Sequence, residues 1–227
     1  MTAATAQAPR ALRLPLRPYQ QEALQAIVDA RARGVTRPLV VLPVGAGKTV
    51  VFAHLLHQRA GRALVLAHRD ELLQQAVAKL CLVDPTAQIG MVKADDNAVD
   101  APVVVASVQT LSRPQRLAQL RPGFATLVVD EAHHATAPTY RRILRHCGAF
   151  QADGPLTLGV TATPERSDTA RLSEVWQAVV YEQSLLALIT AGYLANLRAV
   201  QILLQVNFDA LHTRQGCLLY TSPSPRD

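Results

Sequence analysis

Short apolar runs rich in Val, Leu and Ala alternate along this chain with segments whose apolar residues recur at the spacing of a helix. The runs predict five strands, at residues 38–42, 63–67, 103–107, 126–129 and 156–160. Strands that are apolar at nearly every position are typical of a parallel sheet with helices on both faces. The pattern therefore predicts an α/β fold, a three-layer sandwich around a mostly parallel central sheet.

The helices are predicted between and after these runs, at residues 48–60, 70–80 and 139–150. In the second of them, Leu72, Ala76 and Leu80 recur at helical spacing. In sheets of this class, ligands bind at the carboxyl ends of the strands. Each segment with candidate chemistry directly follows an apolar run, so we expect these segments to meet at one edge of the sheet.

A loop with the sequence PVGAGKT joins the first predicted strand to the first predicted helix. Gly45 and Gly47 allow the backbone to curl, so that several N–H groups point into one concavity. The start of the helix adds the positive end of its dipole to the same place. Lys48 is then expected to reach the outer phosphates of a nucleotide, and Thr49 to bind Mg²⁺. Leu42 stands where the strict phosphate-loop pattern has glycine, but the strand–loop–helix context supports the assignment.

The fourth apolar run ends in two carboxylates and two imidazoles, in the stretch VVDEAHHA. Alone, these groups are compatible with a metal cluster, an acid/base pair or part of a nucleotide-hydrolysing motor. In phosphate-loop ATPases an aspartate at the end of another strand helps to hold Mg²⁺, and Asp130 fits that position. Glu131 is then placed to orient the attacking water. A zinc site built from His133 and His134 is disfavoured, because successive residues face different ways.

Composition indicates a globular protein in a reducing compartment. Hydrophobic residues make up 49% and charged residues 18%, which is enough for a buried core. The cysteines are three, widely spaced and without a metal pattern, so we expect the cytoplasm and no disulfides. The net charge of +6 permits a polyanionic partner without requiring one. No apolar run is long enough to cross a bilayer.

Six segments in order resemble the first motor domain of superfamily 2 DEAD/DEAH-box helicases: LRPYQQEAL, PVGAGKT, LAHRDELLQQ, SVQTL, DEAHHA and TATPERSD. They are most similar to DNA-directed members, namely DNA-repair helicases and the motor subunit of type III restriction enzymes. The resemblance covers nearly all of residues 16–214 and implies a RecA-like P-loop NTPase domain that uses ATP and Mg²⁺ and acts on DNA. An RNA helicase motor and a non-catalytic, ATP-gated binding module are the alternatives.

The resemblance also assigns residues to the nucleotide. Gln20 would hydrogen-bond the adenine edge, and Arg17 would lie near the ring. The residues implied in nucleotide binding are Arg17, Gln20, Val44, Gly45, Ala46, Gly47, Lys48 and Thr49. Those implied in catalysis are Lys48, Asp130, Glu131 and His133, with Thr49 and Asp130 holding Mg²⁺.

Two threonines after the fifth run, Thr161 and Thr163, correspond to the coupling motif of the family. Hydroxyl groups at a strand end can bond to the DEAH segment, and His133 is the expected partner of Thr161. The alternative is that both threonines only cap the turn at Pro164.

Four polar residues after the second and third runs are expected to contact DNA: Arg69, Ser107, Gln109 and Thr110. Arginine and hydroxyl groups suit contacts to phosphates, which position a strand without reading bases. No aromatic stacking platform is evident, so binding is predicted to be salt-sensitive and largely independent of sequence. For Arg69 the alternative is a solvated charge at the start of a helix.

The chain is expected to divide into four segments: a disordered leader (1–14), the RecA-like domain (15–198), the start of a connection (199–216) and a tail (217–227). The tail, CLLYTSPSPRD, can be encoded by a transposon-end adapter used in sequencing libraries. A second motor domain, carrying the arginine that completes the ATP site, is expected beyond this chain. Because such an arginine is worth roughly 10³–10⁵ in rate, we expect weak ATP binding and very slow hydrolysis.

Overall fold

The computed structural model of the chain describes residues 14–162, 172–196, 212–214 and 217–219. Contacts divide the chain into two units, Met1–Leu194 and Ala195–Asp227. In the second unit, β9 (His212–Arg214) and β10 (Cys217–Leu219) form an antiparallel pair. The expected leader, except Leu14, and most of the expected connection and tail lie outside the described residues.

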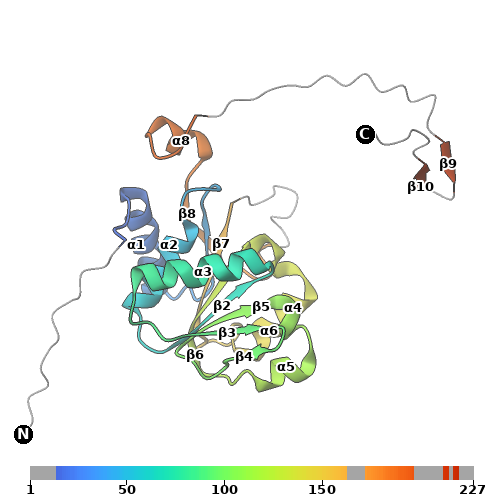
Figure 1. The fold of residues 1–227 in the computed structure, drawn as a ribbon. Helices are drawn as coiled ribbons and strands as arrows, with labels where there is room; N and C mark the ends of the chain where they lie inside the picture. The colour runs from blue at the N-terminus through green and yellow to red at the C-terminus, as the bar shows by residue number, and fades with distance from the viewer. Residues whose placement is uncertain (1–13, 163–171, 197–211, 215–216, 220–227) are drawn as a thin grey trace, which may run out of the picture. The chain divides into compact units, whose positions relative to one another are not determined.

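The first unit contains an eight-stranded sheet in the order β4-β3-β5-β2-β6-β7-β1-β8 (Figure 1). Its strands are β1 (Pro38–Val41), β2 (Arg62–Ala67), β3 (Ile89–Lys93), β4 (Asp96–Asn97), β5 (Val103–Ser107), β6 (Phe124–Asp130), β7 (Leu156–Thr161) and β8 (Ala178–Glu182). All neighbouring pairs are parallel except β3 with β4. The five strands predicted from the sequence are confirmed within one or two residues at each end, whereas β3, β4 and β8 were not among the predicted strands.

Helices cover both faces of this sheet. On one face lie α1 (Pro18–Ala32), α2 (Lys48–Gln58), α3 (Asp70–Val83) and Leu188 of α8 (Leu185–Thr190). On the other lie α4 (Val108–Leu111), α5 (Pro114–Gln119), the 3-10 helix η1 (Ala132–Thr136) and α6 (Pro138–His146). The predicted helices correspond to α2, α3 and α6. No helix within the described part of the chain is long and apolar enough to cross a membrane.

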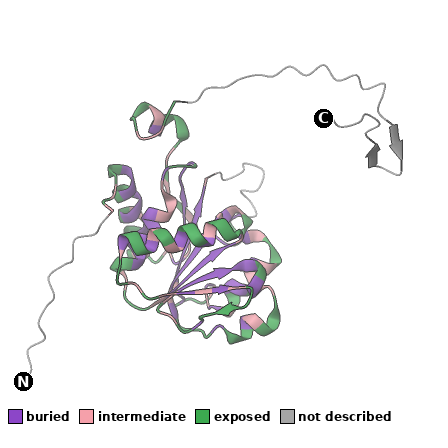
Figure 2. Ribbon diagram, viewed as in Figure 1, coloured by how far each residue is buried: buried purple, intermediate pink, exposed green. Residues whose placement is uncertain are grey.

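Two separate cores fill the spaces between the layers, because successive residues of each strand point to opposite faces. In β2, Val65 belongs to the core under α1–α3, while Leu64 and Leu66 belong to the core under α4–α6. All three side chains are fully buried, and the central strands are buried along nearly their whole length (Figure 2). The continuous apolar runs thus serve both faces, and the predicted three-layer α/β sandwich is confirmed.

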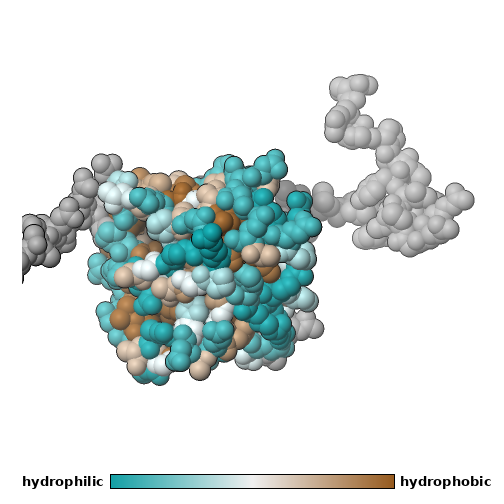
Figure 3. Space-filling model, turned by 90° about the horizontal axis from the view of Figure 1, so that it is seen from below, coloured by the Kyte–Doolittle hydropathy of each residue, from teal (hydrophilic) through white to brown (hydrophobic). Residues whose placement is uncertain are grey.

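The outer surface is mixed. The face in Figure 3 is largely hydrophilic and carries separate hydrophobic areas. Large hydrophobic side chains that stay exposed come from α1, α3, β8, α8 and the loop after β1: Val28, Val44, Leu82, Val179, Leu185 and Leu186.

The register of β6, β7 and β1 brings the candidate chemistry to one edge. Asp130, the last residue of β6, lies opposite Val160 in β7, and Thr161 lies opposite Val41 in β1. Gly159 permits this close packing, because a Cβ atom there would lie 2.8 Å from the ring of Trp176. The phosphate-loop candidate after β1, the carboxylates after β6 and Thr161 therefore meet at the carboxyl edge.

Candidate functional site

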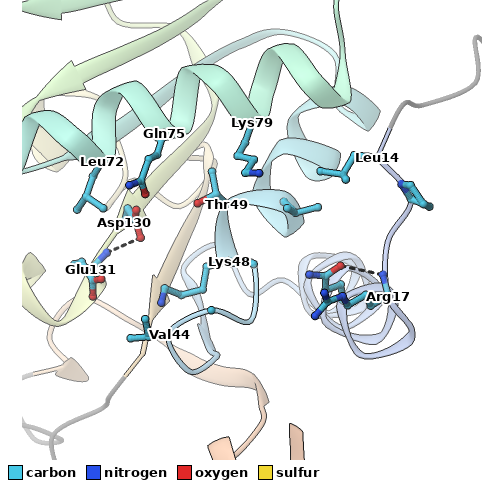
Figure 4. A pocket seen from close by; sticks show the side chains of 15 residues that line it. Leu14, Arg17, Val44, Lys48, Thr49, Leu72, Gln75, Lys79, Asp130 and Glu131 are labelled. Carbon is cyan, nitrogen blue, oxygen red and sulfur yellow. Dashed lines mark hydrogen bonds between the residues drawn. The ribbon is translucent and has the colours of Figure 1, made fainter. Parts of the chain in front are cut away.

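A cavity of about 450 Å³ opens at this edge, between the loop after β1 and the end of β6 (Figure 4). Seven of the eight residues expected to bind nucleotide line it, together with both carboxylates: Arg17, Gln20, Val44, Gly45, Gly47, Lys48, Thr49, Asp130 and Glu131. Ala46 is fully buried, beside the cavity rather than on its wall. One face of α3 also borders the cavity, which the sequence did not indicate.

The loop after β1 has the curled backbone that its glycines allow. Gly45 has φ +83° and Gly47 φ +78°, in the left-handed region that other residues rarely adopt. Gly47 is also the N-cap of α2, so the free N–H groups of this 11-residue helix lie at the cavity. A Cβ atom on Gly47 would lie 2.6 Å from Nε2 of Gln20, so side-chain space is lacking as well. The loop therefore offers an anion site made of backbone donors.

Two side chains of α1 hold this loop in place. Nε2 of Gln20 and the hydroxyl of Tyr19 both donate to the carbonyl oxygen of Ala46, each at 2.8 Å. Oε1 of Gln20 accepts a hydrogen bond from the backbone N–H of Arg17 at 2.9 Å. Gln20 is thus buried and bonded to the loop, a position that the resemblance did not indicate. Tyr19 is a residue that sequence reasoning missed.

At the other end of the cavity, Arg17 contacts two tyrosines, Tyr19 and Tyr193. Nη1 of Arg17 donates to the carbonyl oxygen of Tyr193 at 3.1 Å, and its guanidinium lies 5.8 Å from the Tyr193 ring centre. The rings of Tyr193 and Tyr19 meet edge-on with centres 5.0 Å apart. Arg17 is therefore fixed at the end where the resemblance places the base. No sequence signal distinguished Tyr193, which follows α8.

Lys48, Thr49 and Asp130 face one another across the middle of the cavity (Figure 4). Nζ of Lys48 lies 3.5 Å from the carbonyl oxygen of Leu42, and no carboxylate pairs with it among the described residues. Asp130 is only 6% exposed, and this burial raises its pKa. Its carboxylate accepts the N–H of Glu131 at 3.0 Å. A hydroxyl and a buried, unpaired carboxylate on one cavity are ligands that suit Mg²⁺.

Glu131 adopts an unusual backbone conformation directly after β6. Its φ of +51° lies in the left-handed region, which costs a residue with a side chain roughly 1–2 kcal/mol. The turn ends the strand and places the Glu131 carboxylate on the cavity wall (Figure 4). Strained backbone conformations occur preferentially at functional sites. Here the left-handed conformation of Glu131 turns the chain away from the direction of β6.

The predicted contact between His133 and Thr161 is present. Nδ1 of His133 hydrogen-bonds Oγ1 of the fully buried Thr161 at 3.0 Å and lies 3.5 Å from Oε2 of Glu131. The imidazole therefore bridges the end of β7 and the candidate water-orienting carboxylate. Its coupling role remains a prediction, and Thr163 lies outside the described residues.

A second imidazole pair lies beside this contact. The rings of His134 and His133 have centres 4.1 Å apart, and His134 meets the ring of His68 edge-on at 4.8 Å. Burial lowers the pKa of both His68 and His134, which favours their neutral forms. No group of three His, Cys, Asp or Glu side chains among the described residues could hold a metal ion. His68 was not singled out by the sequence.

A groove of about 510 Å³ follows β2 and β5, and all four candidate DNA contacts line it: Arg69, Ser107, Gln109 and Thr110. Lys93 and Arg113 line it too and were not predicted. The hydroxyl of Ser107 caps α4, and that of Thr110 accepts the N–H of Ala94 at 3.2 Å. Both hydroxyls thus already hold local structure, whereas the cations on this groove are those of Arg69, Lys93 and Arg113.

Comparisons with known proteins agree with this geometry. Residues 13–166 match the family model described as type III restriction enzyme, res subunit. The putative ATP-dependent helicase IRC3 of Saccharomyces cerevisiae is 37% identical over 206 residues, which cover 85% of this chain and 30% of that protein. The DNA 3'-5' translocase XPB2 of Sulfurisphaera tokodaii is 28% identical over 159 residues, covering 69% of this chain and 32% of that protein.

The fold is also found in solved structures. The Pyrococcus furiosus Hef helicase domain aligns with a TM-score of 0.59 at 24% identity, over 74% of this chain and 38% of that one. The chain spans about a third of the length of the curated relatives described above.

Proposed function

Because this chain belongs to the family of the type III restriction enzyme res subunit, within the superfamily 2 helicases, we propose that it is the ATP-binding part of a DNA helicase or translocase. One observation carries the proposal: a single cavity joins the curled loop before Lys48 to the carboxylates of Asp130 and Glu131. The loop suits the phosphates of a nucleoside triphosphate, and the carboxylates suit its metal ion and the attacking water. Their presence in one cavity supports the proposal more strongly than either feature would alone.

The proposed binding mode uses the backbone and three side chains. The N–H groups of the loop and of the first turn of α2 receive the outer phosphates. Lys48 leaves the carbonyl of Leu42 and pairs with them, since its ammonium has no carboxylate partner among the described residues. Thr49 and Asp130 hold Mg²⁺, which when bound neutralises charge on the phosphates. Arg17 and Gln20 adjoin the base.

In the proposed hydrolysis, Glu131 orients a water molecule toward the terminal phosphate and accepts its proton. His133 links Glu131 to Thr161, because its Nδ1 lies within 3.5 Å of both side chains. A conformational change at the end of β7 would therefore alter the position of Glu131. This connection is the proposed path by which hydrolysis and movement on DNA are coupled.

DNA is the proposed polymer, and its backbone phosphates are proposed to lie in the groove lined by Arg69 and Gln109. The name of the archaeal relative, a DNA translocase, supports DNA over RNA. We further propose a second motor domain that supplies the missing arginine, consistent with the chain's spanning about a third of its relatives. The cytoplasm is the proposed location, supported by the free thiols of Cys81 and Cys147.

The test is ATP and DNA binding by this chain. A fluorescent ATP analogue should bind saturably in the presence of Mg²⁺, and a labelled single-stranded DNA should bind with an affinity that falls steeply with salt. Turnover by this chain should be very slow, and it should disappear in Glu131→Gln while ATP binding remains. Failure of the analogue to bind, or full DNA-stimulated turnover by this chain alone, would contradict the proposal.

The alternatives give different results in the same assays. Equal or tighter binding of single-stranded RNA of the same sequence would favour an RNA motor. A nucleotide-gated module without catalysis would retain its response to ATP when Glu131 is replaced by Gln, and turnover would be absent in both proteins.

A further inference from the structure

A second hollow, of about 510 Å³, lies at the opposite end of the sheet. It is formed where β6 and β7 begin and where α1, α2 and α6 end. Along β6, Ala125 at this hollow and Asp130 at the ATP cavity are roughly 17 Å apart, at the rise of a parallel strand. The two cavities are therefore separate, and no motif in the sequence accounts for the second.

Two arginines face this hollow from neighbouring helices. Arg31 stands in the last turn of α1 and Arg59 is the residue after α2. Nε of Arg59 donates to Oγ1 of Thr126 at 2.9 Å, and Thr126 is only 2% exposed. This bond anchors the guanidinium at one corner and leaves its terminal N–H groups available.

Neither arginine makes the contacts that usually account for an arginine at the end of a helix. Within the described part of the chain, neither forms an ion pair, and neither donates to a carbonyl of its own helix. The simplest role for a cation at the end of a helix is to neutralise the partial negative charge of the helix C-terminus. Arg59 does not fit this role, because its guanidinium is bonded to Thr126 instead of to the end of α2. Burial lowers the pKa of Arg59, and the nearby charge of Arg31 lowers it further.

Two like charges held together in a partly buried hollow are unfavourable without a counter-charge. Asp153 also lines the hollow but is not within 4.0 Å of either arginine, so two cations face one carboxylate. A guanidinium presents parallel N–H donors that match the oxygens of a phosphate group. The geometry points to a second anion site in which Arg31 and Arg59 bind phosphate groups, distinct from the proposed ATP cavity.

The test weakens the first site before it examines the second. The full 227-residue chain with Lys48→Ala is titrated calorimetrically with inorganic tripolyphosphate. Saturable binding should persist in this background, and adding Arg31→Gln should weaken it roughly tenfold or more, as expected for a lost charge-assisted hydrogen bond. Adding Arg33→Gln is the matched control, because Arg33 is exposed, near Arg31 and outside the hollow, and it should leave the affinity unchanged.

Absence of binding in the Lys48→Ala chain, or equal weakening by Arg31→Gln and Arg33→Gln, would overturn the inference. Arg31 makes no side-chain hydrogen bond in the described structure, so its replacement should preserve the fold, which circular dichroism checks. Arg59→Gln is the second variant and should weaken binding similarly. These results do not depend on the proposed ATPase, because Arg31 and Arg33 both lie outside its cavity and the two variants are compared in the same Lys48→Ala background.

The phosphate groups could belong to a free oligophosphate or to a nucleic-acid backbone. A single-stranded oligonucleotide that displaces tripolyphosphate from the Lys48→Ala chain, and loses this ability in Arg31→Gln, identifies the backbone as the source. If the oligonucleotide does not compete, the site accepts free oligophosphate.

Discussion

Replacing Gly47 by alanine tests how the curled loop is built, and Gly34 offers a matched control. Both glycines have positive φ, +78° at Gly47 and +87° at Gly34. A Cβ atom at Gly34 would meet nothing within 4 Å, whereas one at Gly47 would lie 2.6 Å from Nε2 of Gln20. The two substitutions therefore share the backbone strain and differ only in the clash.

The structure sets the expected magnitudes. Gly34→Ala should lower the free energy of unfolding by roughly 1–2 kcal/mol, the cost of a left-handed residue with a side chain. In Gly47→Ala the amide of Gln20 must also move, which breaks its bonds to Ala46 and Arg17, each worth about 0.5–1.5 kcal/mol. The total for Gly47→Ala is then roughly 2–5 kcal/mol.

The assay is urea unfolding followed by the fluorescence of Trp176, the only tryptophan and 4% exposed in the core under α4–α6. ATP-analogue affinity is measured on the same proteins and should be lost in Gly47→Ala but retained in Gly34→Ala. Equal destabilisation by the two substitutions, or normal ATP affinity in Gly47→Ala, would refute the reasoning.

Three further predictions concern the carboxyl edge. Burial raises the folded-state pKa of Asp130, so its ionisation costs stability as pH rises from the ordinary value of 3.8 through the raised value; Asp130→Asn should melt higher than the parent chain at pH 7, and the difference should vanish in acid. Glu131→Gly should relieve the strain at φ +51° and add about 1 kcal/mol of stability while abolishing turnover, as urea unfolding and phosphate release would show. Thr161→Val should lose the bond to His133 and cost about 1–3 kcal/mol in urea unfolding, with no effect on ATP affinity.

Much of the fold could be predicted because its strands are apolar on both faces. The signal is local, and the five continuous runs coincide with central strands of the sheet. Strands β3, β4 and β8 were not predicted, because they lie at or next to the edges of the sheet and are at most partly buried. β8 is half-exposed and pairs only with β1. Its position depends on distant contacts, such as the N–H of Thr36 donating to Oε1 of Gln177 at 2.8 Å.

The site also contains residues whose position the sequence predicts and others whose position it does not. The loop glycines, Lys48 and the two carboxylates follow strand ends, so the sequence could place them at one edge. The contacts of Tyr19 and Tyr193 depend on how α1 and the segment after α8 approach the loop, which no spacing indicates. Arg31 and Arg59 likewise meet only because α1 and α2 end side by side at one hollow.

The central claim is that one cavity binds a nucleoside triphosphate through Lys48 and holds its metal ion through Asp130. The most direct measurement is the affinity of a fluorescent ATP analogue for the parent chain, Lys48→Ala and Asp130→Asn, each with and without Mg²⁺. The parent should bind more tightly with Mg²⁺, Lys48→Ala should bind about 10–100-fold more weakly, and Asp130→Asn should lose the response to Mg²⁺. Affinity unchanged in Lys48→Ala, together with a normal Mg²⁺ response in Asp130→Asn, would contradict the account.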